Sequence, residues 1–325
     1  SRMRRLRIFG LFVMLAGFVA CGGETDSAAT ANTLQRGLPS DPETLDHHKA
    51  RSTQAAEVLR DLGEGLAGFT ANGELVPAAA ESWDISDDGL TYTFHLRDGL
   101  RWSNGDALTA EHFVAGMRRL VTPATAAFYA QMIVDIENAA SIVAGDAPPD
   151  ALGVEAVDER TLVLRLSRPT PYMLSLLTHP STFPVHPVAL AEHGDAFARP
   201  GKMVSNGAYR LDAWVPGSVV ALKRNEYYWN NDATAVDAVN YHVIVQNNAE
   251  LNRYRAGELH TTSTVPPDAF AQVREEYGDQ LRVAPYLGVY YYGYNMTTPP
   301  FKDNAALRQA LSMAIDRELL AEKIM

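Results

Sequence analysis

The chain has 325 residues, enough for two domains, and its net charge of −11 argues against a polyanionic partner such as a nucleic acid. Its 46% hydrophobic and 9% aromatic residues suffice for buried cores, and its single cysteine excludes an internal disulfide bond. Packing of apolar side chains must therefore stabilise the folded chain.

The first 20 residues have the layout of a secretory signal peptide. Four arginines, between Arg2 and Arg7, precede a hydrophobic run over Ile8–Ala20, and small or polar residues follow it. The run is shorter than the roughly 20 residues that a membrane-spanning helix needs. The chain has 28 basic and 39 acidic residues, and four of the basic residues lie in this leader. Without the leader, 24 basic residues remain and the net charge is −15.

The only cysteine, Cys21, directly follows this run. Phe18–Cys21 resembles a bacterial lipobox, in which the cysteine after the cleavage site is acylated and becomes the new N-terminus, although Leu, Val or Ile is usual in place of Phe18. Residues 21–32 are then a flexible tether. An ordinary cleaved signal peptide and an uncleaved anchor are the alternatives. Cys21 has no partner motif that would make it a metal ligand or a nucleophile.

From Thr33 onward the chain alternates between helix and strand patterns without an internal repeat, which predicts an α/β fold with antiparallel parts. We expect a helix at Arg60–Leu66, after the polar residues 52–54. Short strands are expected at residues 83–85, 90–96 and 100–102. Asp-Gly pairs separate them and favour hairpins.

The pattern continues with a helix that Thr109–His112 is predicted to cap and that runs through Phe113 and Met117. Further strands are predicted at residues 161–166, 219–223, 239–245 and 290–294.

The last segment, Ala305–Ile324, has the pattern of an amphipathic helix, with Leu307, Leu311, Ile315 and Leu319 on one face. Such a stripe needs a partner surface that the visible sequence barely supplies. Together with Ser1-Arg2 before the first methionine, it leads us to interpret the chain as the N-terminal part of a longer protein.

Two patterns suggest metal sites but fit other structures better. Asp84–Gly89 begins like a calcium-binding loop, but its twelfth residue is His95, where a glutamate is required, so a hairpin explains it better. His47 and His48 are adjacent, and on a strand they would point to opposite faces. We interpret them as surface or turn histidines and expect no metal ion.

The remaining motifs do not indicate an enzyme. His179 and His186 flank prolines in a rigid loop without the His-Glu-x-x-His spacing of a zinc site. The sequence has neither a glycine-rich phosphate loop nor a Gly-x-Ser-x-Gly nucleophile turn. We therefore expect no catalytic residues and no cofactor.

Aromatic residues are concentrated in and beside loops, mainly in the second half of the chain. Rings with a polar tip suit a cleft that holds an extended, partly apolar ligand. Core packing is the alternative, and it must apply to some members of the run 290–292, because a strand sends alternate side chains to opposite faces. The aromatic residues are Phe128, Tyr129, Tyr209, Trp214, Tyr227, Tyr228, Trp229, Tyr286, Tyr290, Tyr291 and Tyr292.

A series of short segments resembles, in the same order, the periplasmic oligopeptide-binding proteins of ABC importers, which belong to bacterial extracellular solute-binding protein family 5. The resemblance covers the whole chain after the leader. The segments are Leu45–Lys49, Leu62–Leu66, Ala80–Asp84, Tyr92–Arg97, Trp102–Asp106, Thr109–Phe113, His179–Thr182, Asn206–Tyr209, Tyr228–Asn231, Asn252–Glu258, Tyr290–Tyr292, Pro300–Phe301 and Leu307–Leu311.

The resemblance implies a three-lobed α/β fold of the type II periplasmic binding protein class, cluster C. Lobe I would take residues 33–63 and 187–287, with lobe II, residues 64–186, inserted between them. Lobe III would begin at residues 288–325, so the chain would lack most of it. The signal peptide, residues 1–20, and the tether precede the lobes.

The resemblance also implies a function. The protein would be a monomeric receptor in the periplasm or on the outer face of the cell membrane, anchored by lipid at Cys21. It would capture oligopeptides in a cleft between lobes and deliver them to an ABC permease and its ATPase. Other solutes remain open: dipeptides, murein peptides, nickel complexes and opines. A signalling or chaperone-like lipoprotein is a further alternative, and the missing nucleophile motif argues against a secreted hydrolase.

Nine residues are implied to bind the ligand. Arg51 and Gly293 stand where the oligopeptide binders have glutamates, so preference around basic side chains should differ. The acidic residue that holds the ligand α-amino group in the family would lie beyond Met325. The nine are Ser52, Thr53, Tyr129, His179, Thr264, Tyr286, Tyr290, Tyr292 and Gly293.

Overall fold

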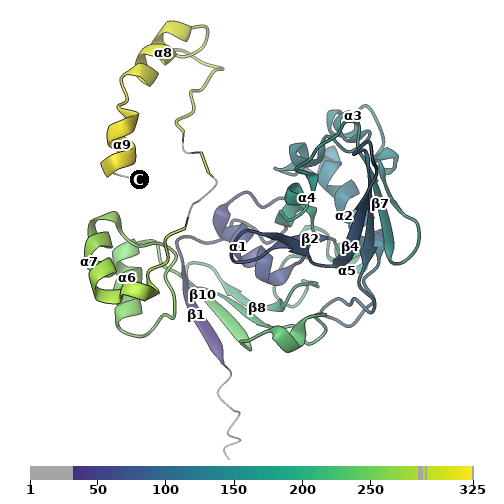
Figure 1. The fold of residues 1–325 in the computed structure, drawn as a ribbon, viewed down its shortest axis with the longest axis horizontal. Helices are drawn as coiled ribbons and strands as arrows, with labels where there is room; N and C mark the ends of the chain where they lie inside the picture. The colour runs from purple at the N-terminus through teal and green to yellow at the C-terminus, as the bar shows by residue number, and fades with distance from the viewer. Residues whose placement is uncertain (1–31, 285–287, 290, 324–325) are drawn as a thin grey trace, which may run out of the picture. The chain divides into compact units, whose positions relative to one another are not determined.

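A computed structural model describes residues 32–284, 288–289 and 291–323 of the chain. The predicted signal peptide and residues 21–31 of the predicted tether, with Cys21, lie outside the described residues. Within them, strands gather into two four-stranded sheets and one two-stranded sheet, with helices between (Figure 1).

The first four-stranded sheet has the order β1-β10-β9-β8. β1 (Thr33–Leu38) pairs in parallel with β10 (Ala238–Val243), so Thr33 lies opposite Ala238. β9 (Val219–Arg224) and β8 (Tyr209–Val215) continue the sheet in antiparallel fashion. The sheet thus joins the start of the described chain to a much later segment, and the strands predicted at 219–223 and 239–245 are confirmed.

Helix α1 (Thr53–Leu62) packs on this sheet through its contact with β8. It begins where it does because the Ser52 side chain accepts a hydrogen bond from the Ala55 amide, at 3.1 Å. It ends at Gly63, whose backbone is extended. The helix predicted at Arg60–Leu66 was therefore wrong in position. The apolar face of α1 packs with the sheet in one hydrophobic core, formed by Leu38, Leu45, Ala55, Val58, Leu59, Leu62, Val220, Leu222, Val239 and Tyr241 among others.

The second four-stranded sheet is antiparallel throughout, in the order β4-β5-β7-β6. Its strands are β4 (Ala80–Ile85), β5 (Thr91–Leu96), β7 (Thr161–Arg165) and β6 (Val154–Ala156). The turn between β4 and β5 contains Gly89 at a φ of +69°, a conformation that favours glycine, and the predicted hairpin is confirmed.

The strand predicted at 100–102 is wrong, because Arg101 makes only an isolated bridge to Ala107. The two-stranded sheet, β2 (Ala67–Phe69) and β3 (Leu75–Pro77), was not predicted. It pairs through only three residues on each strand, too few for a clear alternation in sequence.

Helix α2 (Ala110–Val121) packs against β6 and β7 and buries Phe113, Met117 and Leu120. The predicted helix is confirmed, and its first turn is held by a bond from the Thr109 amide to Nδ1 of His112, at 3.1 Å. These side chains belong to a second hydrophobic core, which includes Phe94, Leu162, Leu164, Ile133, Ile142 and Met173.

Five shorter helices occupy the connections. In the proline-rich segment, His179 and His186 each cap a helical turn, because Nδ1 accepts an amide hydrogen from Ser181 (3.2 Å) and Ala189 (3.1 Å), respectively. The short 3-10 helix η4 (Pro180–Thr182) follows His179. The five shorter α-helices are α3 (Ala139–Ala144), α4 (Met173–Leu176), α5 (Pro187–His193), α6 (Asn247–Arg255) and α7 (Phe270–Tyr277).

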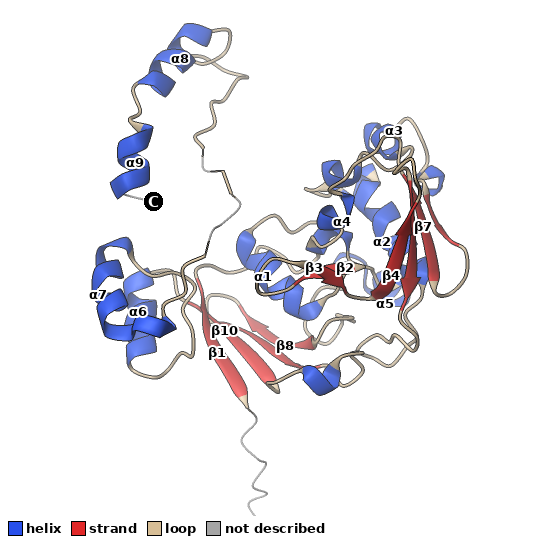
Figure 2. Ribbon diagram, in the orientation of Figure 1, coloured by secondary structure: helices blue, strands red, loops and turns tan. Residues whose placement is uncertain are grey.

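The predicted C-terminal helix is two helices, α8 (Ala305–Met313) and α9 (Arg317–Lys323). Asp316 starts the second one, because its side chain accepts a hydrogen bond from the Leu319 amide at 2.9 Å. The strand predicted at 290–294 is wrong for residues 291–294, which form no strand (Figure 2). No described strand pairs with their backbone, and Tyr290 lies outside the described residues.

The histidine pair lies in a turn, as predicted, but its placement at the surface is wrong. His47 and His48 are buried, with ring centroids 4.2 Å apart. Arg119 of α2 explains the burial: it donates to both carboxylate oxygens of Asp46 (2.8 and 2.7 Å) and lies 2.7 Å from Nδ1 of His48. This buried group joins the turn after β1 to α2.

Gly37 of β1 makes room for a buried carboxylate of α6. A Cβ atom at Gly37 would overlap Oε1 of Glu250, which is fully buried and accepts hydrogen bonds from Ser263 N (2.7 Å) and Oγ (2.9 Å). We expect Gly37→Ala to lower the free energy of unfolding by about 1–3 kcal/mol, as overpacking does. Urea denaturation measures this. Gly68→Ala is the control, because its Cβ would meet only Ala78 at 3.7 Å. Equal losses in the two variants would contradict the account.

Candidate functional site

A cleft of about 600 Å³ opens beside the N-terminal end of α1. Four of the nine predicted ligand residues line it: Ser52, Thr53, Tyr129 and His179. They come from the start of α1, the segment after α2 and the cap of η4, so residues far apart in sequence meet here. The other lining residues are His47, Ala50, Ala56, Glu57, Leu59, Arg60 and Pro180.

The loop before α1 is held by Glu43, a residue that the sequence did not single out. Oε1 of Glu43 accepts hydrogen bonds from the amides of Arg51 (2.5 Å) and Ser52 (2.9 Å), and Oε2 accepts one from the Ser52 hydroxyl. Burial opposes ionisation of Glu43, but these hydrogen bonds outweigh it and lower its pKa. Glu43 is therefore a charged anchor that positions the backbone of residues 51–53 at the edge of the cleft.

Tyr129 and His179 line the cleft together with residues of α1. The Tyr129 hydroxyl donates to the Arg51 carbonyl at 3.1 Å, and its ring meets the His179 ring edge-on at 4.6 Å between centroids. Because Nδ1 of His179 accepts the Ser181 amide, its hydrogen lies on Nε2. Burial, together with the positive charge of Arg60, lowers the pKa of His179 to about 4. His179 is therefore neutral near pH 7.

A second chamber of about 360 Å³ shares Arg60 and His179 with the cleft. Glu64 lies on its wall and accepts hydrogen bonds from the Tyr228 hydroxyl (2.5 Å) and Trp229 Nε1 (2.7 Å). Burial raises the pKa of Glu64 despite these bonds. The further residues of the chamber are Gly63, Gly65, Ala67, Gly68, Phe69, Ala78, Met132, Ser175, Thr178 and Phe183.

The other predicted ligand residues do not join this cleft. Thr264 lines a separate cavity of about 220 Å³ near α6 and α7, whereas Tyr292 and Gly293 lie on an exposed segment. Tyr286 and Tyr290 lie outside the described residues. The structure thus brings together four of the nine, and the role of all nine in binding stays a prediction.

Several of the aromatic residues serve packing and hydrogen bonding, which was the alternative interpretation. Tyr209 is buried and donates to the Val236 carbonyl at 3.2 Å. Trp214 Nε1 donates to Asp41 at 3.4 Å, and Tyr228 and Trp229 hold Glu64. Their polar tips donate to these acceptors, and among the described members of the aromatic group only Tyr129 lines the cleft.

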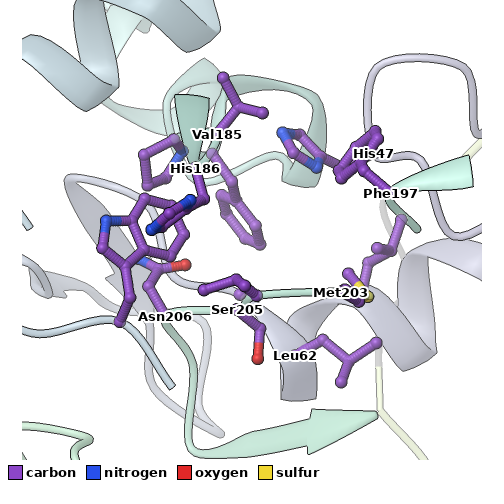
Figure 3. Close-up of a pocket in the computed structure, with 14 residues that line it drawn as sticks. His47, Leu62, Val185, His186, Phe197, Met203, Ser205 and Asn206 are labelled. Carbon is purple, nitrogen blue, oxygen red and sulfur yellow. The ribbon is translucent and has the colours of Figure 1, made fainter. Parts of the chain in front are cut away.

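A fourth cavity shares His47 and Leu59 with the cleft and is too small for a solute (Figure 3). Its free volume is about 20 Å³, which is room for one water molecule. His47 lines both this cavity and the cleft, and its Nε2 has no hydrogen-bond partner within the described part of the chain. The labelled lining residues are His47, Leu62, Val185, His186, Phe197, Met203, Ser205 and Asn206.

Tyr129→Phe tests the hydrogen bond from Tyr129 to the backbone of the loop before α1. The substitution keeps the ring contact with His179 and removes only the bond to the Arg51 carbonyl. We expect a loss of about 1 kcal/mol in unfolding free energy, the net value of one hydrogen bond. Thermal or urea denaturation provides the measurement, with Tyr172→Phe, an exposed tyrosine, as the control. A Tyr129→Phe protein as stable as wild type would show that this bond contributes nothing.

Comparison with known proteins identifies the family. Residues 74–325 match the model of bacterial extracellular solute-binding proteins, family 5 Middle. The chain belongs to this family. The resemblance drawn from the short segments is confirmed. The expectation of a binding protein rather than an enzyme is confirmed too, because this is a family of solute-binding proteins.

Two relatives from Escherichia coli strain K12 are similar to the family 5 chain. The probable deoxycholate-binding periplasmic protein YgiS is 41% identical over 88% of the chain. The periplasmic oligopeptide-binding protein OppA is 38% identical over 97% of it. The chain spans 54% and 59% of these relatives, respectively.

A solved structure resembles the family 5 fold closely. The crystal structure of Haemophilus influenzae OppA in complex with RPPGFSPFR superposes with a TM-score of 0.88 at 37% identity, covering 91% of this chain and 58% of that one. The predicted α/β fold of this class is thereby confirmed. Among the described helices, none is both long enough and apolar enough to cross a membrane.

Proposed function

We propose that the protein is the solute-binding receptor of an ABC importer and that its ligand is an oligopeptide. One observation carries the proposal: Ser52, Thr53, Tyr129 and His179 line a single cleft, in a fold similar to a structure solved with a bound nonapeptide. The similarity to E. coli OppA over 97% of the chain supports the same ligand class.

The lobe boundaries predicted from the resemblance are part of this proposal. Lobe I comprises residues 33–63 and 187–287, lobe II residues 64–186, and lobe III begins at residue 288. Two separate hydrophobic cores support the first boundary. One core draws on residues 38–62 and 185–241, and the other on residues 66–177. The chain passes between the cores near Gly63, where α1 ends.

The mechanism needs no chemistry on the ligand. The peptide main chain pairs with protein backbone near residues 51–53, in a manner that does not depend on the peptide's side chains. Water in the cleft and in the second chamber adapts to each side chain. Closure of the lobes then buries the peptide until the permease receives it. Arg51 and Gly293, in place of glutamates, weaken the preference for basic side chains.

The protein acts outside the cytoplasm, in the periplasm or on the outer face of the cell membrane. Its relatives in E. coli are named as periplasmic, and the leader has the pattern of a signal peptide. Acylation at Cys21 would keep the receptor near the permease. Metabolic labelling with palmitate, in wild type and in Cys21→Ser, tests the anchor. Equal labelling of both would show that Cys21 is not acylated.

A second ligand class has its own support. The relative YgiS, 41% identical, is named as a probable deoxycholate-binding protein. Native mass spectrometry of the full-length protein, purified from cells without refolding, separates the two. Bound masses in the range of short peptides are expected. A single bound species with the mass of a bile acid or another non-peptide solute would overturn the oligopeptide proposal.

A further inference from the structure

Helix α1 carries three charged residues, Glu57, Arg60 and Asp61, and two of them are already paired. Glu57 forms an ion pair with Arg36 of β1. Asp61 accepts a hydrogen bond from the Tyr241 hydroxyl of β10, at 2.6 Å. Both carboxylates are therefore engaged by partners from the sheet.

Arg60, between them in sequence, is different. Within the described residues, its side chain makes no hydrogen bond and no ion pair, although it is solvent-exposed and lines the cleft. A charge that stays unpaired on the wall of a cavity is available to a ligand.

The surroundings of Arg60 favour an anionic group. Arg60 lines both the cleft and the second chamber, so a group bound there lies where the two meet. His179, the other shared residue, is neutral near pH 7. The acids that line the two chambers are Glu57, which forms an ion pair with Arg36 and also feels the charge of Arg60, and Glu64, whose oxygens accept from Tyr228 and Trp229. The described part of both chambers thus offers one unpaired charge, and it is positive.

We propose that Arg60 binds a carboxylate of the solute, so that this receptor prefers ligands that carry an acidic group where the cleft and the second chamber meet. A guanidinium can hold a carboxylate through two parallel hydrogen bonds, which an amide cannot reproduce. The inference rests on the proposed function only in that the solute occupies this cleft. Binding of the peptide main chain does not depend on the peptide sequence, and Arg60 adds a preference for a negatively charged group.

Isothermal titration of the full-length protein tests the preference with matched peptides. Tetra-alanine is varied to glutamate or glutamine at each of its four positions, so that charge changes while size does not. At one position, glutamate should bind about 10-fold more tightly than glutamine, the value of a charged hydrogen bond. In Arg60→Gln this ratio should fall to about one. Arg210→Gln, which removes an exposed charge from β8 outside both chambers, should keep it.

A second probe pair keeps the inference testable if no peptide binds. Deoxycholate and its uncharged methyl ester differ in the same way, in one carboxylate. If no peptide binds but deoxycholate binds and this binding depends on Arg60, the oligopeptide proposal is overturned and this inference is supported. Equal affinity for charged and neutral partners in both pairs would overturn it, as would a preference that survives in Arg60→Gln. Circular dichroism of both variants confirms that they are folded.

Discussion

Replacing Arg119 by methionine should destabilise the protein by about 3–5 kcal/mol, the cost of leaving one member of a buried ion pair without its partner. The side chains of Arg119 and Asp46 are 12% and 3% exposed, and two hydrogen bonds join them. Burial works against ionisation of Asp46, but the hydrogen bonds from Arg119 outweigh it and lower the pKa of that carboxyl. Without Arg119, a buried carboxylate would remain.

Two further variants separate this effect from a general loss of packing. Arg118→Met removes a neighbouring arginine of α2 whose contact with Glu111 is long, 3.8 Å, and exposed, so it should cost less than about 1 kcal/mol. Combining Arg119→Met with Asp46→Leu removes both charges and should recover much of the loss. Urea denaturation of the four proteins measures these differences. Equal losses for Arg118→Met and Arg119→Met would refute the role of the buried pair.

Acidification should destabilise the protein steeply between about pH 6.5 and pH 4, because His47 and His48 are buried in their neutral forms. Burial lowers the pKa of His47 to about 4, with Asp46 opposing and Arg119 adding to the shift. The pKa of His48 is also lowered, by burial and then by His47 and Arg119. As pH falls below 6.5, these two histidines bind protons in the unfolded chain but stay neutral in the folded state. Each histidine then costs about 1.4 kcal/mol per pH unit.

The pH dependence of the unfolding free energy must be compared between wild type and a variant, because other groups change stability in the opposite direction. Asp61 and Glu64 have pKa values raised by burial, so they add stability as pH falls. In His48→Gln, the slope of unfolding free energy against pH should be lower by about 1.4 kcal/mol per unit below pH 6. Parallel slopes for the two proteins would mean that His48 does not resist protonation.

Much of the fold follows from local pattern. The alternation in Thr91–Leu96 and the spacing of Phe113 and Met117 on α2 place apolar side chains on one face, and the structure buries those faces. The predicted position of the first helix was wrong because its caps set its ends. Ser52 starts α1 and Gly63 ends it, earlier than the apolar pattern indicated. Burial of the histidine pair could not be predicted, because Arg119 reaches it from a distant part of the sequence.

The candidate site also contains residues that could be proposed from the sequence and residues that could not. Ser52, Thr53, Tyr129 and His179 could be proposed because short segments resembled a family. Glu43 and Arg60 could not. Glu43 matters because its carboxylate reaches amides at residues 51 and 52, and Arg60 because its neighbours are paired with Arg36 and Tyr241. Those pairings depend on strands that meet only in the folded sheet.

Calorimetric titration of the full-length protein with neutral tetrapeptides of unrelated sequence tests the central claim most directly. We predict binding of comparable strength for all of them, since the main chain makes the contacts, and loss of binding when the peptide amides are N-methylated. Absence of binding for every peptide, while deoxycholate or another non-peptide solute binds, would contradict it.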